Sequence, residues 1–319
     1  MPAAPPVIDR TLARLRRWLR EPLFPRAGFA LSGGRLLGAV LSPKESRVAA
    51  HVSIALPEGV LEPSFDRPNI LRPGPLEDKI KEAARRLGIS GADIVLLPPE
   101  SCFKAYVLAF DEFPSAAAER LVLLNHRLDK VSPLRPADVR MAYDVLPAEG
   151  KINVFLALAR ASVIEEYERV FDRHGLRPRA VSLPSLGLPG CVPVDPGRKI
   201  LLANIEEDSI GLLAWAGPEV VLYRFKPFHR PPGEAAAAES RLEQAAAEIE
   251  NTIHFLEDRE GWRGETVHAR SLLVPAAGDA AAFLSGRLAV PVLPVACPAA
   301  MAAAGADKAA FAPLLGHLS

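Results

Sequence analysis

The sequence is poor in the features that mark several functional classes. Its three cysteines, Cys102, Cys191 and Cys297, include no short-spaced pair, so we expect neither a disulfide framework nor a zinc site, and a reducing compartment fits. Its 38 acidic and 38 basic residues cancel, so no net charge attracts nucleic acid. The seven histidines are scattered, and there is no P-loop, G-x-S-x-G or H-E-x-x-H motif. We predict no metal site and no nucleic-acid partner.

The sequence also lacks an uninterrupted apolar run that could cross a membrane as a helix. The strongest candidate is the uncharged segment 289–306, AVPVLPVACPAAMAAAGA. Its prolines at positions 291, 294 and 298 exclude a continuous helix, so we interpret it as a short strand followed by an alanine-rich stretch. The N-terminus lacks the apolar region of a signal peptide. We therefore expect a soluble protein.

The N-terminal segment, residues 1–25, contains a candidate basic amphipathic helix. Residues 8–20, IDRTLARLRRWLR, have apolar side chains at helical spacing and five arginines around them. One interpretation is a helix lying on an anionic membrane surface, with Arg14, Arg17 and Trp18 as contacts. The alternative is a helix packed on the body of the protein, or a solvated tail.

Apolar residues, in contrast, are abundant at 49%, and they follow an α/β pattern that recurs along the chain. Three short strands in meander order are followed by a helix and another strand. Residues 102–184 then have the order β-α-β-β-α-β. A second meander begins near residue 199, and a long helix near 235–258 and a strand-helix-strand unit follow it. This recurrence predicts two related halves.

The pattern resembles the type IV pilus assembly protein PilM family, in the actin-like superfamily that includes the division protein FtsA. The resemblance runs from about Arg26 to the C-terminus, and its segments occur in the family's order: ALPEGVLEPS, FKAYVLAFDEFPSAAAERLVLLNHRLDKVSPLRPADVRMAYDVL, INVFLALARASVIEEYERVFDRHGLRPRAVSLPSLGL and AEIENTIHFLEDREG. It implies an α/β, ribonuclease H-like fold with two actin-like lobes, at 26–101 and 185–319. It also implies a small inserted β-α-β-β-α-β subdomain at 102–184.

The resemblance further implies a place for ATP, with phosphates between two hairpin turns, one from each lobe, and an aspartate on each strand to position Mg²⁺. The motifs of that site are altered here and read GFALSGGRLL, LANIEEDSI and VPAAGD. Both acidic positions are lost, to Ala30 and Asn204. The loops themselves carry Ser32, Gly33, Gly34, Glu206, Asp208, Ala276, Ala277 and Gly278.

These changes predict a degenerate nucleotide site. The acids Glu206, Glu207 and Asp208 would lie where a triphosphate lies, and like charges about 4 Å apart repel by roughly 1 kcal/mol even in water. Glu206 also places a Cβ where a glycine backbone would touch phosphate. We therefore expect no nucleotide cofactor and no catalytic residues, that is, a pseudo-ATPase. An actin-like ATPase or a sugar kinase of the same superfold is the alternative.

The resemblance implies a non-catalytic scaffold of a type IV pilus machine, associated with the cytoplasmic face of the bacterial inner membrane. Its partners would be the cytoplasmic tail of a PilN-like membrane protein and the platform and motor proteins of the machine. The tail would lie as an extended peptide between the first lobe and the inserted subdomain. Candidate groove residues, with ordinary core packing as the alternative, are Tyr106, Leu108, Phe110, Leu123 and Arg127. A GspL-like cytoplasmic component of type II secretion is a further alternative.

Overall fold

The computed structural model describes most of the chain. The described residues are 25–42, 47–131, 136–146, 151–192, 199–216, 219–229, 238–262, 266–273, 277–295 and 307–318. The predicted N-terminal helix, with Arg14, Arg17 and Trp18, lies outside these residues, as does Ala276. In the described part, no helix is long and apolar enough to cross a membrane.

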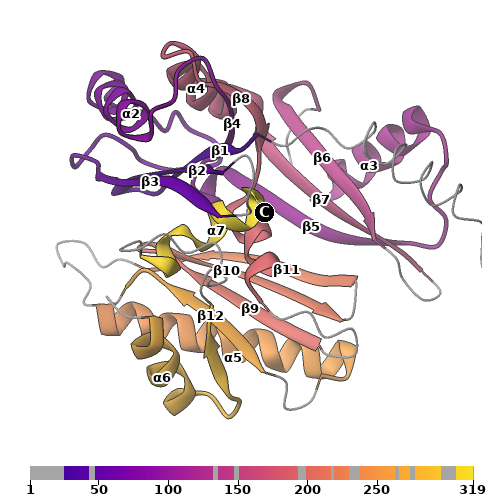
Figure 1. The fold of residues 1–319 in the computed structure, drawn as a ribbon. Helices are drawn as coiled ribbons and strands as arrows, with labels where there is room; N and C mark the ends of the chain where they lie inside the picture. Colours follow the sequence, from indigo (N-terminus) through magenta and orange to yellow (C-terminus); the bar gives the residue numbers. More distant parts are fainter. Residues whose placement is uncertain are drawn as a thin grey trace, which may run out of the picture.

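The first lobe is a five-stranded sheet with helices against it (Figure 1). Its central strand is buried along its whole length, and Phe29 on that strand packs against Phe171 with ring centroids 5.2 Å apart. The buried face of the helix α2 (Pro73–Leu87) is apolar and consists of Leu76, Ile80, Ala83 and Leu87. In sheet order the strands are β3 (Val48–Ala55), β2 (Arg35–Leu41), β1 (Ala27–Leu31), β4 (Asp93–Leu97) and β8 (Arg177–Val181), and the helices are α2 (Pro73–Leu87) and α4 (Ala161–Asp172).

The inserted subdomain is an antiparallel three-stranded sheet with one helix on its face. Its own core contains Phe110, Leu124, Leu128, Val154 and Leu156. The sheet follows a short 3-10 turn, η1 (Glu100–Cys102), at the end of β4. In sheet order the strands are β5 (Phe103–Phe110), β7 (Ile152–Arg160) and β6 (Val139–Leu146), and the helix is α3 (Ala117–Val131).

The predicted order β-α-β-β-α-β is confirmed, but its last two elements belong to the first lobe. β8 pairs in parallel with β4, with Ile94 opposite Pro178. The side chains of Val163, Tyr167 and Phe171 on α4 join the core that contains the α2 residues. Because a parallel neighbour needs a long crossover connection, the segment 103–172 serves as that crossover and β8 closes it. The subdomain proper therefore ends at β7 rather than at residue 184.

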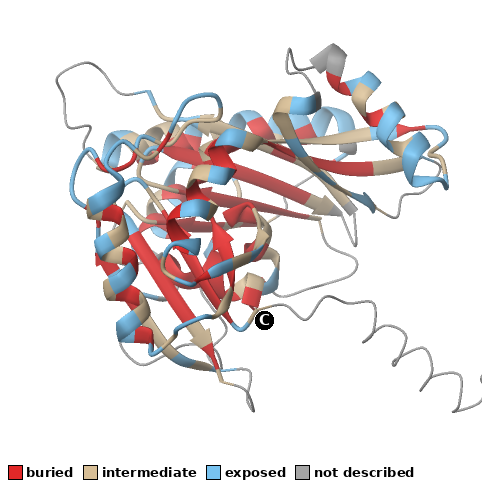
Figure 2. Ribbon diagram, turned by 90° about the horizontal axis from the view of Figure 1, so that it is seen from above, coloured by how far each residue is buried: buried red, intermediate tan, exposed pale blue. Residues whose placement is uncertain are grey.

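The second lobe repeats the first, as the sequence predicted. A meander of three antiparallel strands is extended by parallel strands beyond its first strand, and this is also the arrangement of the first lobe. In sheet order the strands are β11 (Glu219–Pro227), β10 (Ser209–Ala216), β9 (Lys199–Ile205), β12 (Val267–Ser271) and β13 (Val292–Pro294), and the helices are α5 (Ala238–Glu260) and α6 (Ala277–Arg287). Figure 2 shows that the sheets of both lobes are largely buried and that exposed residues lie mainly on the helices and loops.

A C-terminal helix, α7 (Lys308–Leu318), lies between the two lobes (Figure 1). Its apolar residues share one core with Leu37 and Ala39 of the first sheet and with Leu202 of the second. It also packs on the 3-10 segment η3 (Pro184–Cys191), which connects the lobes. The predicted boundary at 185–319 therefore needs correction at its end, because α7 belongs to the junction of the lobes rather than to the second lobe alone.

Candidate functional site

The turn between β1 and β2 and the turn between β9 and β10 face one cavity of about 510 Å³ between the lobes. Ser32, Gly33 and Gly34 line it from the first lobe, and Glu206, Glu207 and Asp208 line it from the second. From the sequence we expected the two turns to face each other, and the structure brings these six residues together. Ala277 and Gly278, from the third altered motif, are the first residues of α6.

The glycine turn of the first lobe is covered by an acid from the second. A Cβ added at Gly34 would lie 3.3 Å from Oε2 of Glu207, whereas a Cβ at Gly33 would meet nothing within 4 Å. Neither Gly33 nor Gly34 has a φ in the left-handed region, so the turn does not need glycine for its backbone conformation. The Glu207 carboxylate thus occupies the space over the turn that an anion would need.

Asn204, on β9, is fully buried and accepts a hydrogen bond from an arginine. Arg270, on β12, is only 2% exposed, and its Nη1 donates hydrogen bonds to Oδ1 of Asn204 and Oε1 of Glu206. The side chain of Glu206 is 16% exposed. The expectation that Glu206 adds a free negative charge to the cleft is therefore corrected, because Arg270 balances that charge. Glu207 and Asp208 are the other two acids of the turn, and Arg241, which lines the same cavity, places a positive charge near Asp208.

Sequence reasoning missed Arg270, although the sequence held a signal. In VHARS, residues 267–271, an arginine is the fourth residue of a short strand that pairs with β9. A buried cation is tolerated in a protein only when it is paired and hydrogen-bonded. Its partner could not be identified from spacing, because Glu206 is 64 residues away.

A chain of buried hydrogen bonds leads from Asn204 into the first lobe. Asn204 Nδ2 donates to Ser185 Oγ at 3.1 Å, and the Ser185 backbone N–H donates to Glu100 Oε2 at 3.0 Å. The Tyr223 hydroxyl donates to Glu100 Oε1 at 2.7 Å. Burial raises the pKa of Glu100 above its ordinary value, while the hydrogen bonds from Tyr223 and Ser185 oppose this shift. The glycine at 211 gives this network room, because a Cβ there would lie 2.7 Å from Ser185 Oγ.

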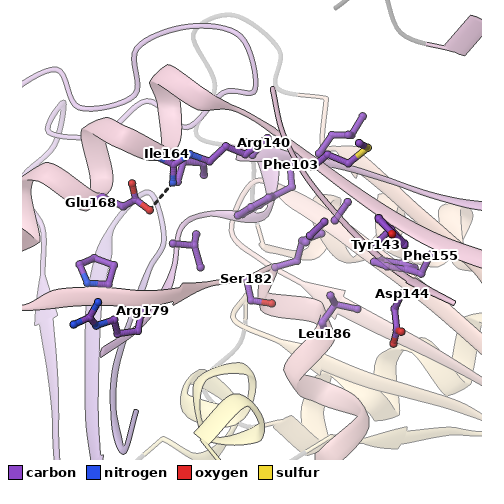
Figure 3. A pocket seen from close by; sticks show the side chains of 18 residues that line it. Phe103, Arg140, Tyr143, Asp144, Phe155, Ile164, Glu168, Arg179, Ser182 and Leu186 are labelled. Carbon is purple, nitrogen blue, oxygen red and sulfur yellow. Dashed lines mark hydrogen bonds and ion pairs between the residues drawn. The ribbon is translucent and has the colours of Figure 1, made fainter. Parts of the chain in front are cut away.

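A second cavity, of about 460 Å³, lies between the inserted subdomain and the first lobe (Figure 3). One wall comes from β6 and β7, and the other comes from α4, β8 and the segment 182–186. Phe103, Phe155, Ile164 and Leu186 give it apolar surface. The charged residues on its lining are Arg140, Asp144, Glu168 and Arg179, and Arg140 Nη1 donates to Glu168 Oε1 at 2.6 Å.

The five predicted groove residues do not border this cavity. Tyr106, Leu108, Phe110 and Leu123 instead pack in or against the core beneath α3. The guanidinium of Arg127 lies over the Phe110 ring, 5.4 Å from its centroid. On β5 the side chains of Tyr106, Leu108 and Phe110 face α3, while Phe103 lines the cavity. Four of the five candidates thus show the alternative of ordinary core packing, while Arg127 is exposed on α3.

Comparisons with known proteins bear on the fold. No family model and no curated protein matches the sequence. Among solved structures, the chain is similar to one from a PilM–PilN type IV pilus biogenesis complex, with a TM-score of 0.75 and 16% identity over 93% of this chain and 97% of that chain. The actin-like fold that the sequence indicated is thus confirmed, and it is the fold of a chain from that complex.

Two further similar structures have lower TM-scores. The cytoplasmic domain of EpsL, an inner-membrane component of the type II secretion system of Vibrio cholerae, has a TM-score of 0.48 and 14% identity over 78% of this chain and 82% of that chain. MreB 5 of Spiroplasma citri, bound to AMPPNP, has a TM-score of 0.45 and 10% identity over 93% of this chain and 95% of that chain.

Proposed function

We propose that the protein is a non-catalytic, actin-like scaffold of a type IV pilus machine. It holds the cytoplasmic tail of a PilN-like membrane protein at the cytoplasmic face of the inner membrane. The similarity to a chain of the PilM–PilN complex supports this assignment. The observation that carries it is the cavity between the inserted subdomain and the first lobe, because its shape and lining suit an extended peptide.

Two exposed sheet edges form the walls of this cavity. β6 is the edge of the inserted sheet, and β8 is the edge of the first-lobe sheet. An edge strand presents unpaired N–H and C=O groups that can bind an extended chain. β6 is the better template, because Pro178 removes one N–H donor from β8. A peptide alongside β6 would place apolar side chains against Phe103, Phe155 and Ile164.

The second part of the proposal is that the interlobe cleft does not turn over ATP. The carboxylates at positions 30 and 204 are replaced, and Asn204 is bonded to Arg270 instead. Glu207 covers Gly34, where the phosphate cradle would be. A triphosphate would have to displace this acid and approach Asp208 as well. A protein that binds other proteins is therefore favoured over an ATPase or a sugar kinase.

The proposal is tested with a synthetic peptide that copies the cytoplasmic tail of the PilN-like protein from the same organism. Fluorescence anisotropy measures its affinity for the wild type and for Ala142→Arg, which places a long cation in the groove at an exposed β6 position. Val122→Arg is the matched control, because Val122 is 70% exposed on α3 and does not line the cavity. Ala142→Arg should abolish binding and the control should retain it. Absence of wild-type binding, or equal affinity in both variants, would contradict the proposal.

A further inference from the structure

Arg270 reaches the C-terminal helix as well as the turn of the second lobe. Its Nε donates to the carbonyl oxygen of Ala309 at 2.5 Å, and its Nη2 donates to that of Ala310 at 3.3 Å. The Ala309 carbonyl is available because the residue four positions later is Pro313, which has no N–H to donate within α7. The proline inside this helix therefore leaves an acceptor free for a cation from another element.

The helix that Arg270 holds is packed tightly on the first lobe. A Cβ added at Gly28 on β1 would lie 2.8 Å from Cδ1 of Leu314 and 3.3 Å from Cδ2 of Leu318. On another side, a Cβ at Gly316 would lie only 1.8 Å from the carbonyl oxygen of Gly187 in η3. Through α7, the guanidinium on β12 is thus connected to the first lobe and to the segment between the lobes.

A second route leads from the same guanidinium to the first lobe. Arg270 donates a hydrogen bond to Asn204, and Asn204 donates one to Ser185. The backbone N–H of Ser185 in turn donates a hydrogen bond to Glu100, which follows β4. Each of these residues is at most 4% exposed. Hydrogen bonds in such a buried network are strong, and an unpaired member would be costly.

We propose that Arg270 is an internal clamp that joins the two lobes from within the chain. In a cleft that binds a nucleotide, the ligand contacts the turns of both lobes and biases their arrangement. Here a cation of the chain itself binds the β9–β10 turn through Glu206, the first lobe through Asn204 and Ser185, and the junction through α7. The clamp does not depend on what occupies the groove beside the inserted subdomain.

Hydrogen–deuterium exchange on the full chain tests this proposal. Arg270→Met should raise amide exchange in α7 and η3 by about a hundredfold, because removing one member of a buried ion pair leaves the other uncompensated. Arg224→Met is the matched control. Arg224 also pairs with a glutamate of the second lobe, Glu248, at 2.9 Å, but both side chains are more than a quarter exposed. This variant should leave exchange in α7 unchanged.

If Arg270→Met does not fold, Glu206→Gln replaces it in the same comparison. It keeps an acceptor for Arg270 but removes the charge of a partly exposed partner, so exchange in α7 should rise by about tenfold. Protection of α7 and η3 that is unchanged in the variant used would overturn the proposal. An increase confined to the second-lobe sheet would also overturn it, because Arg270 would then stabilise only its own lobe.

Discussion

Glu207 and Gly34 meet across the interlobe cleft, one from each lobe, so that a Cβ on Gly34 would lie 3.3 Å from Oε2 of the acid. In a phosphate-binding turn the glycine backbone must stay open to an anion. Here the Glu207 carboxylate lies over Gly34, and Arg270 forms an ion pair with the neighbouring Glu206. The two turns still line one cavity, and polar side chains around it contact one another.

This contact predicts that the glycine turn tolerates substitution. Gly34→Ala should change the free energy of unfolding by less than about 1 kcal/mol, because its φ is not left-handed and the atom that its Cβ meets is the end of a flexible side chain. Urea denaturation measures the change. A loss of more than about 2 kcal/mol would show that the turn requires glycine for a reason other than phosphate.

The contact between α7 and η3 predicts the opposite behaviour. Gly316→Ala should destabilise the protein by about 3 kcal/mol or more, because the added Cβ would lie 1.8 Å from a backbone oxygen that cannot move alone. Gly286→Ala in α6 is the control, since a Cβ there meets nothing within 4 Å, and it should be neutral or stabilising by up to about 1 kcal/mol. Equal denaturation midpoints for the two variants would contradict the packing of α7 between the lobes.

Glu100 predicts a pH dependence of stability. Burial raises its pKa in the folded state above the ordinary value of 4.5, so the folded protein binds this proton more tightly than the unfolded chain does. The stabilisation is complete below the ordinary value and is lost as the pH rises through the raised one. Glu100→Gln mimics the protonated form and removes this loss.

The free energy of unfolding of the wild type should therefore fall relative to that of Glu100→Gln as the pH rises above the ordinary value of 4.5. Denaturant titrations of both proteins across this range measure the difference. Burial lowers the pKa of His317, which acts with the opposite sign, but that residue is present in both proteins and its effect cancels. A difference that is independent of pH would contradict the assignment of a buried, proton-binding Glu100.

The basic segment at the N-terminus predicts weak membrane binding. Deleting residues 1–22 should reduce co-sedimentation with vesicles that contain anionic lipid, because arginines attract the negative surface and Trp18 enters the interface. Vesicles of neutral lipid are the control and should bind both forms equally. Equal sedimentation of both forms with anionic vesicles would refute a membrane role for Arg14 and Arg17.

Much of the fold could be predicted because it depends on local patterns. Both meanders and the long helix follow from alternation and helical spacing. Pairing over long distances could not be predicted in the same way. The attachment of β8 to β4 and the packing of α7 between the lobes depend on which apolar faces meet, and the sequence does not specify this.

In the candidate sites, too, local patterns predict the positions of elements but not the contacts of single side chains. The two turns were expected to face one cleft and they do, because the fold fixes their positions. The candidate groove residues Tyr106 and Leu108 lie on the face of β5 that packs under α3, whereas Phe103 lines the cavity between the subdomain and the first lobe. The pairing of Arg270 with Glu206 is a contact between side chains 64 residues apart, and only the structure shows it.

The central claim is that an acidic side chain of the chain itself covers the glycine turn of the interlobe cleft, where the phosphates of a nucleotide would bind. Isothermal titration calorimetry of the full chain with Mg-ATP tests it most directly. We predict no saturable heat at a protein concentration that would detect a dissociation constant of about 10 μM. A dissociation constant below about 10 μM, with ATP contacting the turns of both lobes in a crystal structure, would contradict the account.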